Sequence, residues 1–428
     1  MADLQPGPGS LPKAVDVYTH SDGRDMLAGR LYSHRGRRAE SATFTYADSF
    51  LADPRGYELD PALPMVTGAQ QTSVGLPMFR AFADSAPDRW GRRLIARAEG
   101  IRAERDSGTA RTLSEFTYLL GVRDDLRQGA LRFAAPDTST FLATDTTGVP
   151  ALTDLPKLLD LAQRAEDDDV GYEELRTLLR AGSSLGGARP KAHVRRGDGR
   201  VAIAKFPSAG SDVWHVMAWE KTTHDLARAA GITVPDSELL NVAGRQVHII
   251  DRFDRVGDTR VGYVSAMTML EARDGDVGSY LDIAAVIEDH SSSATAELRQ
   301  LWKRVAFSVL VSNTDDHLRN HGFLHGAGDV WTLSPAFDLN PDPSPGVKQL
   351  ATAIDADDTT ASIDLVMRVA PLFRLGGDTL RQALAEVTVA AGTWRKVAAG
   401  NGLSEKEISQ LAPAFEHREA VVARSLIA

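Results

Sequence analysis

The sequence predicts a mixed α+β protein in which a small α+β subdomain precedes two lobes, the second of them mainly helical. Three observations support this fold class. Two strand-like segments are followed by two helix-like segments over 26–98, a glycine-rich segment leads into paired apolar strands in the middle of the chain, and leucine-rich helical patterns fill 361–428. We expect four segments: a flexible tail over 1–12, the α+β subdomain over 13–150, a first lobe over 151–250 and a mainly helical lobe over 251–428.

The composition excludes several classes of protein. The 428 residues are 43% hydrophobic, which is enough for one or two substantial cores. Cysteine is absent, which excludes disulfides, thiolate catalysis and zinc–thiolate sites. No segment approaches the ~18 uninterrupted apolar residues of a membrane helix, and the N-terminus does not have the pattern of a signal peptide, so we expect a cytoplasmic protein without a membrane partner. A net charge of −10 disfavours tight DNA binding by this chain alone.

The N-terminal subdomain is predicted from two strand-like and two helix-like segments, over 26–32, 42–46, 77–83 and 89–98. The stretch 138–150 is dense in Thr, Asp and Gly and is the best candidate for a linker. Beyond it, 152–180 predicts one or two amphipathic helices with an acidic break at 166–169.

A glycine-rich segment over 182–191 precedes a strand pair. Small residues let backbone N–H groups approach phosphate oxygens, so this segment is a candidate phosphate-binding loop. The strands are expected over 192–194 and 201–205, joined by a basic, solvated turn with Asp198 and Gly199 at the bend.

The second of these strands, Val-Ala-Ile-Ala-Lys, resembles the protein-kinase strand whose terminal Lys contacts phosphates and pairs with a helical Glu. Here that Lys is Lys205, and its partner would be Glu220 on a helix expected over 213–230. A later apolar strand over 247–250 runs into a polar turn, a pattern that suits an adenine-binding hinge.

The segment 313–320, Asn-Thr-Asp-Asp-His-Leu-Arg-Asn, is followed by Ser-Pro-Ala-Phe-Asp-Leu-Asn over 334–340. An Asp, an Asn five positions later and a further Asp form the catalytic pattern of protein kinases, in which the first Asp accepts a hydroxyl proton and the other two hold magnesium. These places are filled by Asp315, Asn320 and Asp338. Magnesium tolerates little geometric slack, so its ligands must come from stiff neighbouring segments. Short strands are expected between them, over 323–324 and 330–333.

Four blocks resemble the HipA-type serine/threonine kinases, the toxins of bacterial toxin–antitoxin pairs. The blocks are Ser-Leu-Gly-Gly-Ala-Arg-Pro-Lys (184–191), Arg-Phe-Asp-Arg (252–255), Thr-Asp-Asp-His-Leu-Arg-Asn-His (314–321) and Ser-Pro-Ala-Phe-Asp-Leu-Asn-Pro (334–341). Two N-terminal pieces, 27–31 and 87–93, resemble the module that precedes the kinase in that family. The resemblance covers nearly the whole chain and implies a two-lobed protein-kinase-like fold with an N-terminal α+β subdomain and an all-helical C-terminal lobe.

The resemblance also implies roles for single residues, with ATP as the phosphate donor and Mg²⁺ as the metal. Asp315 would be the catalytic proton acceptor, and Asn320 and Asp338 would be the metal ligands. The residues near the ATP phosphates would be Gly186, Gly187, Ala188, Arg189, Lys191 and Lys205. The other nucleotide-binding residues would be Asp251 and Phe253 at the adenine, Asp254 at the ribose, and His317, Asn320 and Phe337 along the site.

The same resemblance implies autophosphorylation at Ser184, with Ser183 as the alternative, and a phosphoserine there would repel the loop from ATP through its added charge of roughly −1.5 to −2. The implied partners are a small helix-turn-helix antitoxin, DNA only through that antitoxin, and a protein substrate for which aminoacyl-tRNA synthetases are candidates. The alternative is a catalytically weak, kinase-shaped binding protein that acts mainly as a co-repressor with the antitoxin.

Other readings of the catalytic segment remain open. His317, His321 and His325 with the two neighbouring Asp residues could form a metallohydrolase cluster, but this reading leaves Lys205 and the glycine-rich loop without a role. Asp316 could repel the catalytic Asp or bind a metal, although a capping or solvent-exposed residue is preferred. His317 could be a structural hydrogen-bonding residue rather than a nucleotide contact. Trp214 and Trp219 are expected to pack in the core, and the Ser404–Glu407 segment is expected to form a helix-capping box.

Overall fold

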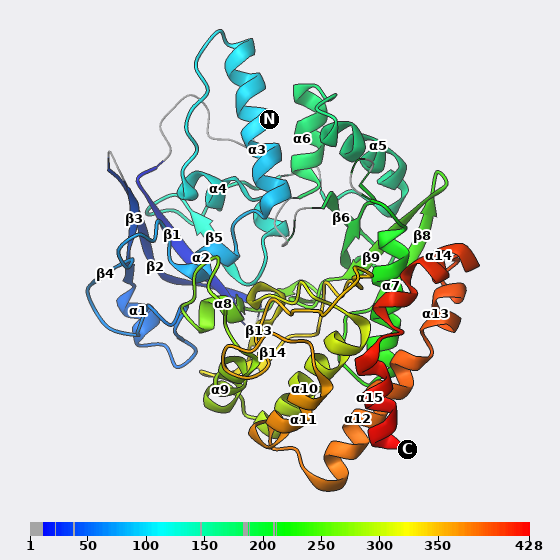
Figure 1. Ribbon diagram of the computed structural model, residues 1–428. Coiled ribbons are helices and arrows are strands. Elements are labelled where there is room, and N and C mark those ends of the chain that lie inside the picture. The colour runs from blue at the N-terminus through cyan, green and yellow to red at the C-terminus, as the bar shows by residue number, and fades with distance from the viewer. Residues whose placement is uncertain are drawn as a thin grey trace. The chain divides into compact units, whose positions relative to one another are not determined.

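The computed structural model describes residues 12–21, 23–36, 39–145, 148–182, 187, 189–208, 210 and 212–428. The chain forms two compact units. The first contains the residues up to Gly210 with Asp251–Val264 and Leu324–Asp329, and the second contains Ser211–Ile250, Ser265–Phe323 and Val330–Ala428. Both units mix helices and strands, which confirms the predicted fold class (Figure 1). The predicted division into four segments stays a prediction.

An antiparallel five-stranded sheet, with the order β4-β3-β2-β1-β5, is the core of the first unit. Its strands are β1 (Ala14–Ser21), β2 (Arg24–Arg35), β3 (Glu40–Tyr46), β4 (Ala69–Gln71) and β5 (Leu131–Ala134). Alternate residues of β3, including Phe44 and Tyr46, are buried, and the Phe44 and Phe82 ring centroids lie 5.6 Å apart. Gly29 in β2 cannot carry a side chain, because a Cβ there would lie 2.2 Å from the Thr45 carbonyl oxygen.

Helices and two hairpins complete the first unit. The helices are α1 (Asp48–Leu51), α2 (Arg80–Asp84), α3 (Arg89–Arg105), α4 (Glu115–Gly121), α5 (Leu155–Glu166) and α6 (Tyr172–Arg180). The hairpins pair β6 (Lys191–Arg195) with β7 (Val201–Lys205) and β10 (Arg255–Val256) with β11 (Thr259–Arg260). The predicted acidic break is confirmed, because it separates α5 from α6. The predicted bend at Asp198 and Gly199 in the first hairpin is also confirmed, because Gly199 N donates to Arg196 O at 3.0 Å.

The predicted linker, 138–150, is partly packed against the sheet. Leu142 N donates to Phe133 O in β5 at 2.8 Å, and the Phe141 ring meets the Tyr18 ring edge-on at 5.4 Å between centroids. The linker prediction is therefore wrong for this part, because an aromatic side chain inside a polar stretch packs on the neighbouring strands.

The second unit is built around α10 (Ala294–Val311), whose residues are all buried from Leu301 onwards. Helices α9 (Tyr280–His290), α11 (Ile363–Val369) and α12 (Gly377–Gly392) contact it (Figure 1). Trp302 fixes one of these contacts by donating from Nε1 to Val366 O at 2.9 Å. The other elements that lie wholly or partly in this unit are α7 (Val216–Ala229), β8 (Ser237–Val242), β9 (Arg245–Asp251), β12 (Tyr263–Ser265), α8 (Ala266–Met269), β13 (Gly322–His325), β14 (Trp331–Leu333), α13 (Trp394–Gly400), α14 (Glu405–Leu411) and α15 (Arg418–Ile427).

Trp219 packs in the core of the second unit, as predicted. Its side chain is fully buried, and its ring centroid lies 6.2 Å from that of Trp394 and 5.9 Å from that of Phe415. Trp214 lies before the first residue of α7, so the expected helix over 213–230 begins later than predicted. Among the described residues, no helix has both the length and the apolar character that a membrane crossing requires.

The predicted capping box at α14 is confirmed. Ser404 Oγ accepts from Glu407 N, and Ser404 N donates to the Glu407 carboxylate at 2.8 Å. Replacing Ser404 with Ala leaves one N–H of the first turn without its acceptor, so we expect a loss of about 0.5–2 kcal/mol in the free energy of unfolding. Urea denaturation measures this loss; Ser409→Ala, in the same helix but away from its first turn, is the control and should change stability less.

Candidate active site

The candidate catalytic segment, 313–320, begins where α10 ends. Ser312 adopts a left-handed conformation with φ of 53°, and Asn313 N returns to Ser308 O at 2.8 Å, so the helix closes with a sharp change of direction. The Ser312 hydroxyl donates to Ala414 O at 3.0 Å and fixes this turn to the C-terminal region. The residues after the turn are therefore held by a buried helix end.

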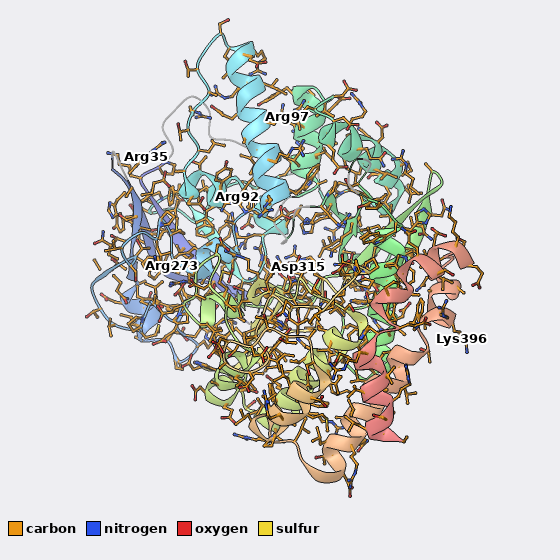
Figure 2. The ribbon with its side chains drawn as sticks, in the orientation of Figure 1. Arg35, Arg92, Arg97, Arg273, Asp315 and Lys396 are labelled. Atoms are coloured by element: carbon orange, nitrogen blue, oxygen red, sulfur yellow. The ribbon has the colours of Figure 1, made fainter. Side chains whose placement is uncertain are left out.

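Asp315, which is labelled in Figure 2, lies in the loop that follows. Its side chain is exposed. Its backbone oxygen accepts from His317 N and from Asn320 Nδ2, both at 3.0 Å, while Asn320 N donates to His317 O at 2.8 Å. Within the part of the chain that the structure describes, the Asp315 carboxylate makes no hydrogen bond or ion pair. These contacts hold the backbone of the loop and leave the carboxylate accessible.

Asn320 is oriented by the same hydrogen bond. Because its Nδ2 donates to the Asp315 carbonyl, its Oδ1 points elsewhere, and no hydrogen bond to Oδ1 occurs among the described residues. An amide oxygen that is held in this way is suited to a hard cation.

Asp316 differs from its exposed neighbour. It is 3% exposed; its Oδ2 accepts from the hydroxyls of Tyr280 (2.6 Å) and Ser308 (3.1 Å), and His321 Nε2 lies 3.2 Å from its Oδ1. The preferred prediction of a capping or solvent-exposed residue is therefore wrong. Burial raises the pKa of this carboxyl, whereas His321 and the hydroxyl donors lower it. The lowering effects are together the larger, so the pKa lies below its usual value and Asp316 is ionised.

Asp338 follows β14 and is half-buried, with a left-handed φ of 57°. Asn340 Nδ2 donates to its Oδ1 at 3.3 Å, and Asn340 N donates to Asn313 Oδ1 at 3.3 Å. Asp342 N donates to Ser312 O at 3.0 Å. The segment with Asp338 is therefore attached to the same end of α10 as the loop with Asp315, which is the proximity that the motif predicts.

The His317 ring is half-buried beside Asp315. Its Nδ1 is inaccessible to solvent, and the ring makes no hydrogen bond to any described residue. The structure thus gives no support to a structural hydrogen-bonding role. Phe337, next to Asp338, is half-buried. The predicted nucleotide contacts of His317 and Phe337 stay predictions.

The three histidines do not form the metallohydrolase cluster. His325 belongs to the first unit, where its Nε2 lies 2.7 Å from Gly328 O and its ring stacks on Tyr57 with centroids 3.6 Å apart. His321 faces Asp316, as described above. No group of three or more His, Asp or Glu side chains suited to a metal ion is found among the described residues.

In the first unit, the glycine-rich segment is anchored to α3. Lys191 is 4% exposed, and its Nζ lies 2.5 Å from an oxygen of Asp88, the residue that caps α3 by accepting from Gly91 N. Gly187 adopts φ of 116°, and a Cβ on it would lie 3.2 Å from Lys191 Nζ. Lys191 thus has a structural partner that the sequence did not reveal. Of the other predicted loop residues, Arg189 is half-buried, and Ser183, Ser184, Gly186 and Ala188 lie outside the described residues.

Asp254 is buried and accepts hydrogen bonds from several protein donors. Its buried carboxylate accepts from Arg252 Nε and Nη2 at 2.8 and 2.6 Å, from Arg255 Nη1 at 2.9 Å and from Gly129 N at 2.8 Å. These contacts give the carboxylate a structural role, and its predicted contact with ribose hydroxyls stays a prediction. The Arg-Phe-Asp-Arg block is a buried ionic cluster that holds Gly129 beside it.

The remaining predicted nucleotide residues, Asp251, Phe253 and Lys205, belong to the first unit. The Asp251 carboxylate pairs with Arg196 and Arg200, while the Phe253 ring lies 6.2 Å from that of Tyr263. Asp251 and Phe253 therefore stay predicted adenine contacts through their backbone groups only. Lys205 ends β7 in the first unit and Glu220 lies buried on α7 in the second, so their pairing stays a prediction.

The sequence reasoning missed the side chains that hold the catalytic loop. Tyr280, Ser308 and Thr352 are separated from the motif by up to 36 positions, and none carries a local pattern that indicates a role. Asp88 could have been recognised as a helix cap from its place before a helix-like segment, but its partner Lys191 lies 103 positions away.

Comparisons with known proteins agree with these features. The HipA-like C-terminal domain model matches residues 183–399, and the HipA N-terminal domain model matches residues 17–113. A protein of Haemophilus influenzae whose name gives it as a candidate kinase is 29% identical over 135 residues, which cover 28% of this chain and 39% of that protein. One of Sinorhizobium fredii, with a name of the same kind, is 30% identical over 158 residues, or 33% of this chain and 38% of that protein. The match therefore spans less than two-fifths of either relative.

Among solved structures, the Shewanella oneidensis complex of HipA, HipB and operator DNA contains a chain of the same fold. The TM-score is 0.62 at 17% identity, and the match covers 96% of both chains. Since the C-terminal domain model alone matches more than half of the sequence, this chain belongs to the HipA family.

Proposed function

We propose that the protein is an ATP- and Mg²⁺-dependent serine/threonine protein kinase of HipA type that acts as a growth-inhibiting toxin. The observation that carries the proposal is the pairing of an exposed Asp315 with Asn320 in one hydrogen-bonded loop, attached to the helix end that also holds the segment with Asp338. Family membership and the names of the two relatives support the same class of activity.

The residues of the second unit fit a magnesium ion by their chemistry. Asn320 Oδ1 and the Asp338 carboxylate are hard oxygen donors, and Asn340 Oδ1 is a further buried oxygen without a described partner. A magnesium ion held there would supply positive charge that stabilises the negative charge developing during phosphate transfer. Asn320 and Asp338 would hold the metal.

Asp315 would accept the proton of a serine or threonine hydroxyl and orient its oxygen towards the γ-phosphate. The exposure of its carboxylate suits this role because the substrate is a second protein. Gly187, Arg189, Lys191 and Lys205 would contribute to binding the phosphates of ATP.

Radioactive phosphate transfer tests the proposal. The wild-type protein incubated with γ-labelled ATP and Mg²⁺ should label itself at Ser184, and Ser184→Ala, but not Ser183→Ala, should remove the labelled peptide identified by mass spectrometry. Chelation of the metal, and Asp338→Asn separately, should abolish labelling. Failure of the wild-type protein to label itself or any protein in a bacterial lysate would refute the proposed activity.

A small DNA-binding antitoxin is proposed as the partner, since the related Shewanella chain occurs in a complex with HipB and operator DNA. DNA would be contacted mainly through that partner, which agrees with the net charge of −10. The substrate would be a cellular protein, with aminoacyl-tRNA synthetases as candidates, and phosphoproteomics after brief expression would identify it. Operator binding with a partner, but without any phosphate transfer, would favour the co-repressor alternative.

A further inference from the structure

Asp316 is the centre of a buried polar network below the catalytic loop. Its side chain accepts hydrogen bonds from the hydroxyls of Tyr280 and Ser308 and lies next to His321. Its backbone oxygen accepts from Thr352 Oγ1 at 2.7 Å. Each of these five residues is at most 3% exposed. A buried carboxylate that accepts two hydroxyl hydrogen bonds restrains the side chains that donate them.

Three separate parts of the second unit hold this network in place. Tyr280 is the first residue of α9, where Ser279 and Asp282 form a capping box, and Tyr280 N donates to Ala353 O at 2.9 Å. Thr352, the residue before that acceptor, is the one that reaches the Asp316 backbone. The position of Asp316 is thus determined from α9, from α10 through Ser308, and from the segment at 352–353.

The network continues towards the proposed metal ligand. Ser308 Oγ donates to Asp316 and accepts a long contact of 3.5 Å from Asn313 Nδ2. Asn313 Oδ1 accepts from Asn340 N, and Asn340 Nδ2 donates to Asp338 Oδ1, each at 3.3 Å. The donor and acceptor roles are consistent along the whole series, so one set of polar contacts runs from beside Asp315 to Asp338.

We propose that Asp316 is a positioning residue: its buried contacts with Tyr280, Ser308 and His321 fix the backbone that carries Asp315 and, through Asn313 and Asn340, keep that backbone in register with Asp338. Asp315 and Asp316 are consecutive, so a buried, anchored carboxylate at one position determines where the exposed carboxylate at the other can lie. The catalytic meaning of this role rests on the proposed kinase activity, whereas the mechanical role does not.

Two conservative variants test the inference. Asp316→Asn keeps the volume but removes the negative charge and turns one acceptor oxygen into a donor, which faces either the two hydroxyls or His321. Tyr280→Phe removes only the 2.6 Å contact. The matched control is Tyr46→Phe, which removes a buried tyrosine hydroxyl bonded to Leu63 O at 2.8 Å in the other unit.

Hydrogen exchange of the protein without nucleotide is the first measurement. The amides of His317 and Asn320, which donate within the loop, should exchange about tenfold faster in both variants but not in Tyr46→Phe, while amides in the middle of α12 stay unchanged. Unchanged exchange of His317 and Asn320 in both variants would overturn the inference, whatever the activity. If Asp316→Asn does not fold, Tyr280→Phe alone decides.

Kinetics are the second measurement. A displaced catalytic group should lower kcat by about 10–100-fold, with the KM for ATP changed less than about threefold, because the loop no longer holds the reacting groups in place. A rise of about 10–100-fold in the KM for ATP, with kcat unchanged, would contradict a positioning role for Asp316. If the wild-type protein transfers no phosphate, the proposed function fails, and the exchange rates still decide the role of Asp316.

Discussion

Replacing Asp315 with Asn is expected to lower the rate of phosphate transfer by about 10²–10⁴-fold, the usual contribution of a general base. The substitution is isosteric and the carboxylate makes no described contact, so the loop backbone, held by His317 N and Asn320 Nδ2, should keep its structure. The measurement is the initial rate of transfer from γ-labelled ATP at saturating ATP, with the thermal midpoint of unfolding recorded in parallel.

The matched control for this substitution is Asp289→Asn, an exposed carboxylate near the end of α9. It should leave both the rate and the midpoint unchanged. A rate for Asp315→Asn within threefold of the wild type would assign the proton transfer to another group. An equal loss in both variants would indicate damage to the fold rather than to the chemistry.

The spacing of the motif predicted a compact loop over 315–320, which the structure shows, while the catalytic role of this loop stays a prediction. An Asp and an Asn five positions apart predicted one rigid loop, and the Asn320 side chain bonded to the Asp315 carbonyl is a direct reason for that spacing. The prediction failed at Asp316, because two adjacent carboxylates look alike in a sequence while one is exposed and the other is 3% exposed. Burial of Asp316 depends on Tyr280 and Thr352, which only the folded chain brings near.

The Arg-Phe-Asp-Arg block shows a different limit of sequence reasoning. Resemblance located the block correctly, but a block of charged residues beside a proposed nucleotide site suggests ligand contacts, whereas these residues contact each other and Gly129. Three of the four donors to Asp254 come from Arg252 and Arg255 in the block itself, and the fourth is Gly129 N, 125 positions away, which no local pattern indicates. The positions of helices and strands along the chain were thus easier to predict than the contacts that buried charged side chains make.

Asp254→Asn should destabilise the first unit by about 3–5 kcal/mol, the usual cost of removing one partner from a buried ion pair. The variant keeps the shape of the side chain but leaves the Arg252 and Arg255 guanidinium groups buried beside a neutral amide. Urea unfolding followed by tryptophan fluorescence and circular dichroism measures the loss. Asp258→Asn, four positions later and exposed, is the control and should stay within about 0.5 kcal/mol of the wild type.

The effect of Asp254→Asn should also depend on pH. Burial raises the pKa of Asp254, whereas Arg252, Arg255 and Gly129 N lower it. The lowering effects together outweigh burial, so the pKa in the folded protein lies well below the value of about 3.9 in the unfolded chain. A depressed pKa stabilises the fold fully above the unfolded pKa, and this contribution declines as the pH falls towards the folded pKa. The difference in stability between wild type and variant should therefore be constant near neutral pH and shrink below about pH 4. A difference that grows on acidification would contradict an ionised Asp254, and a ribose-binding carboxylate without protein partners would give no large difference at any pH.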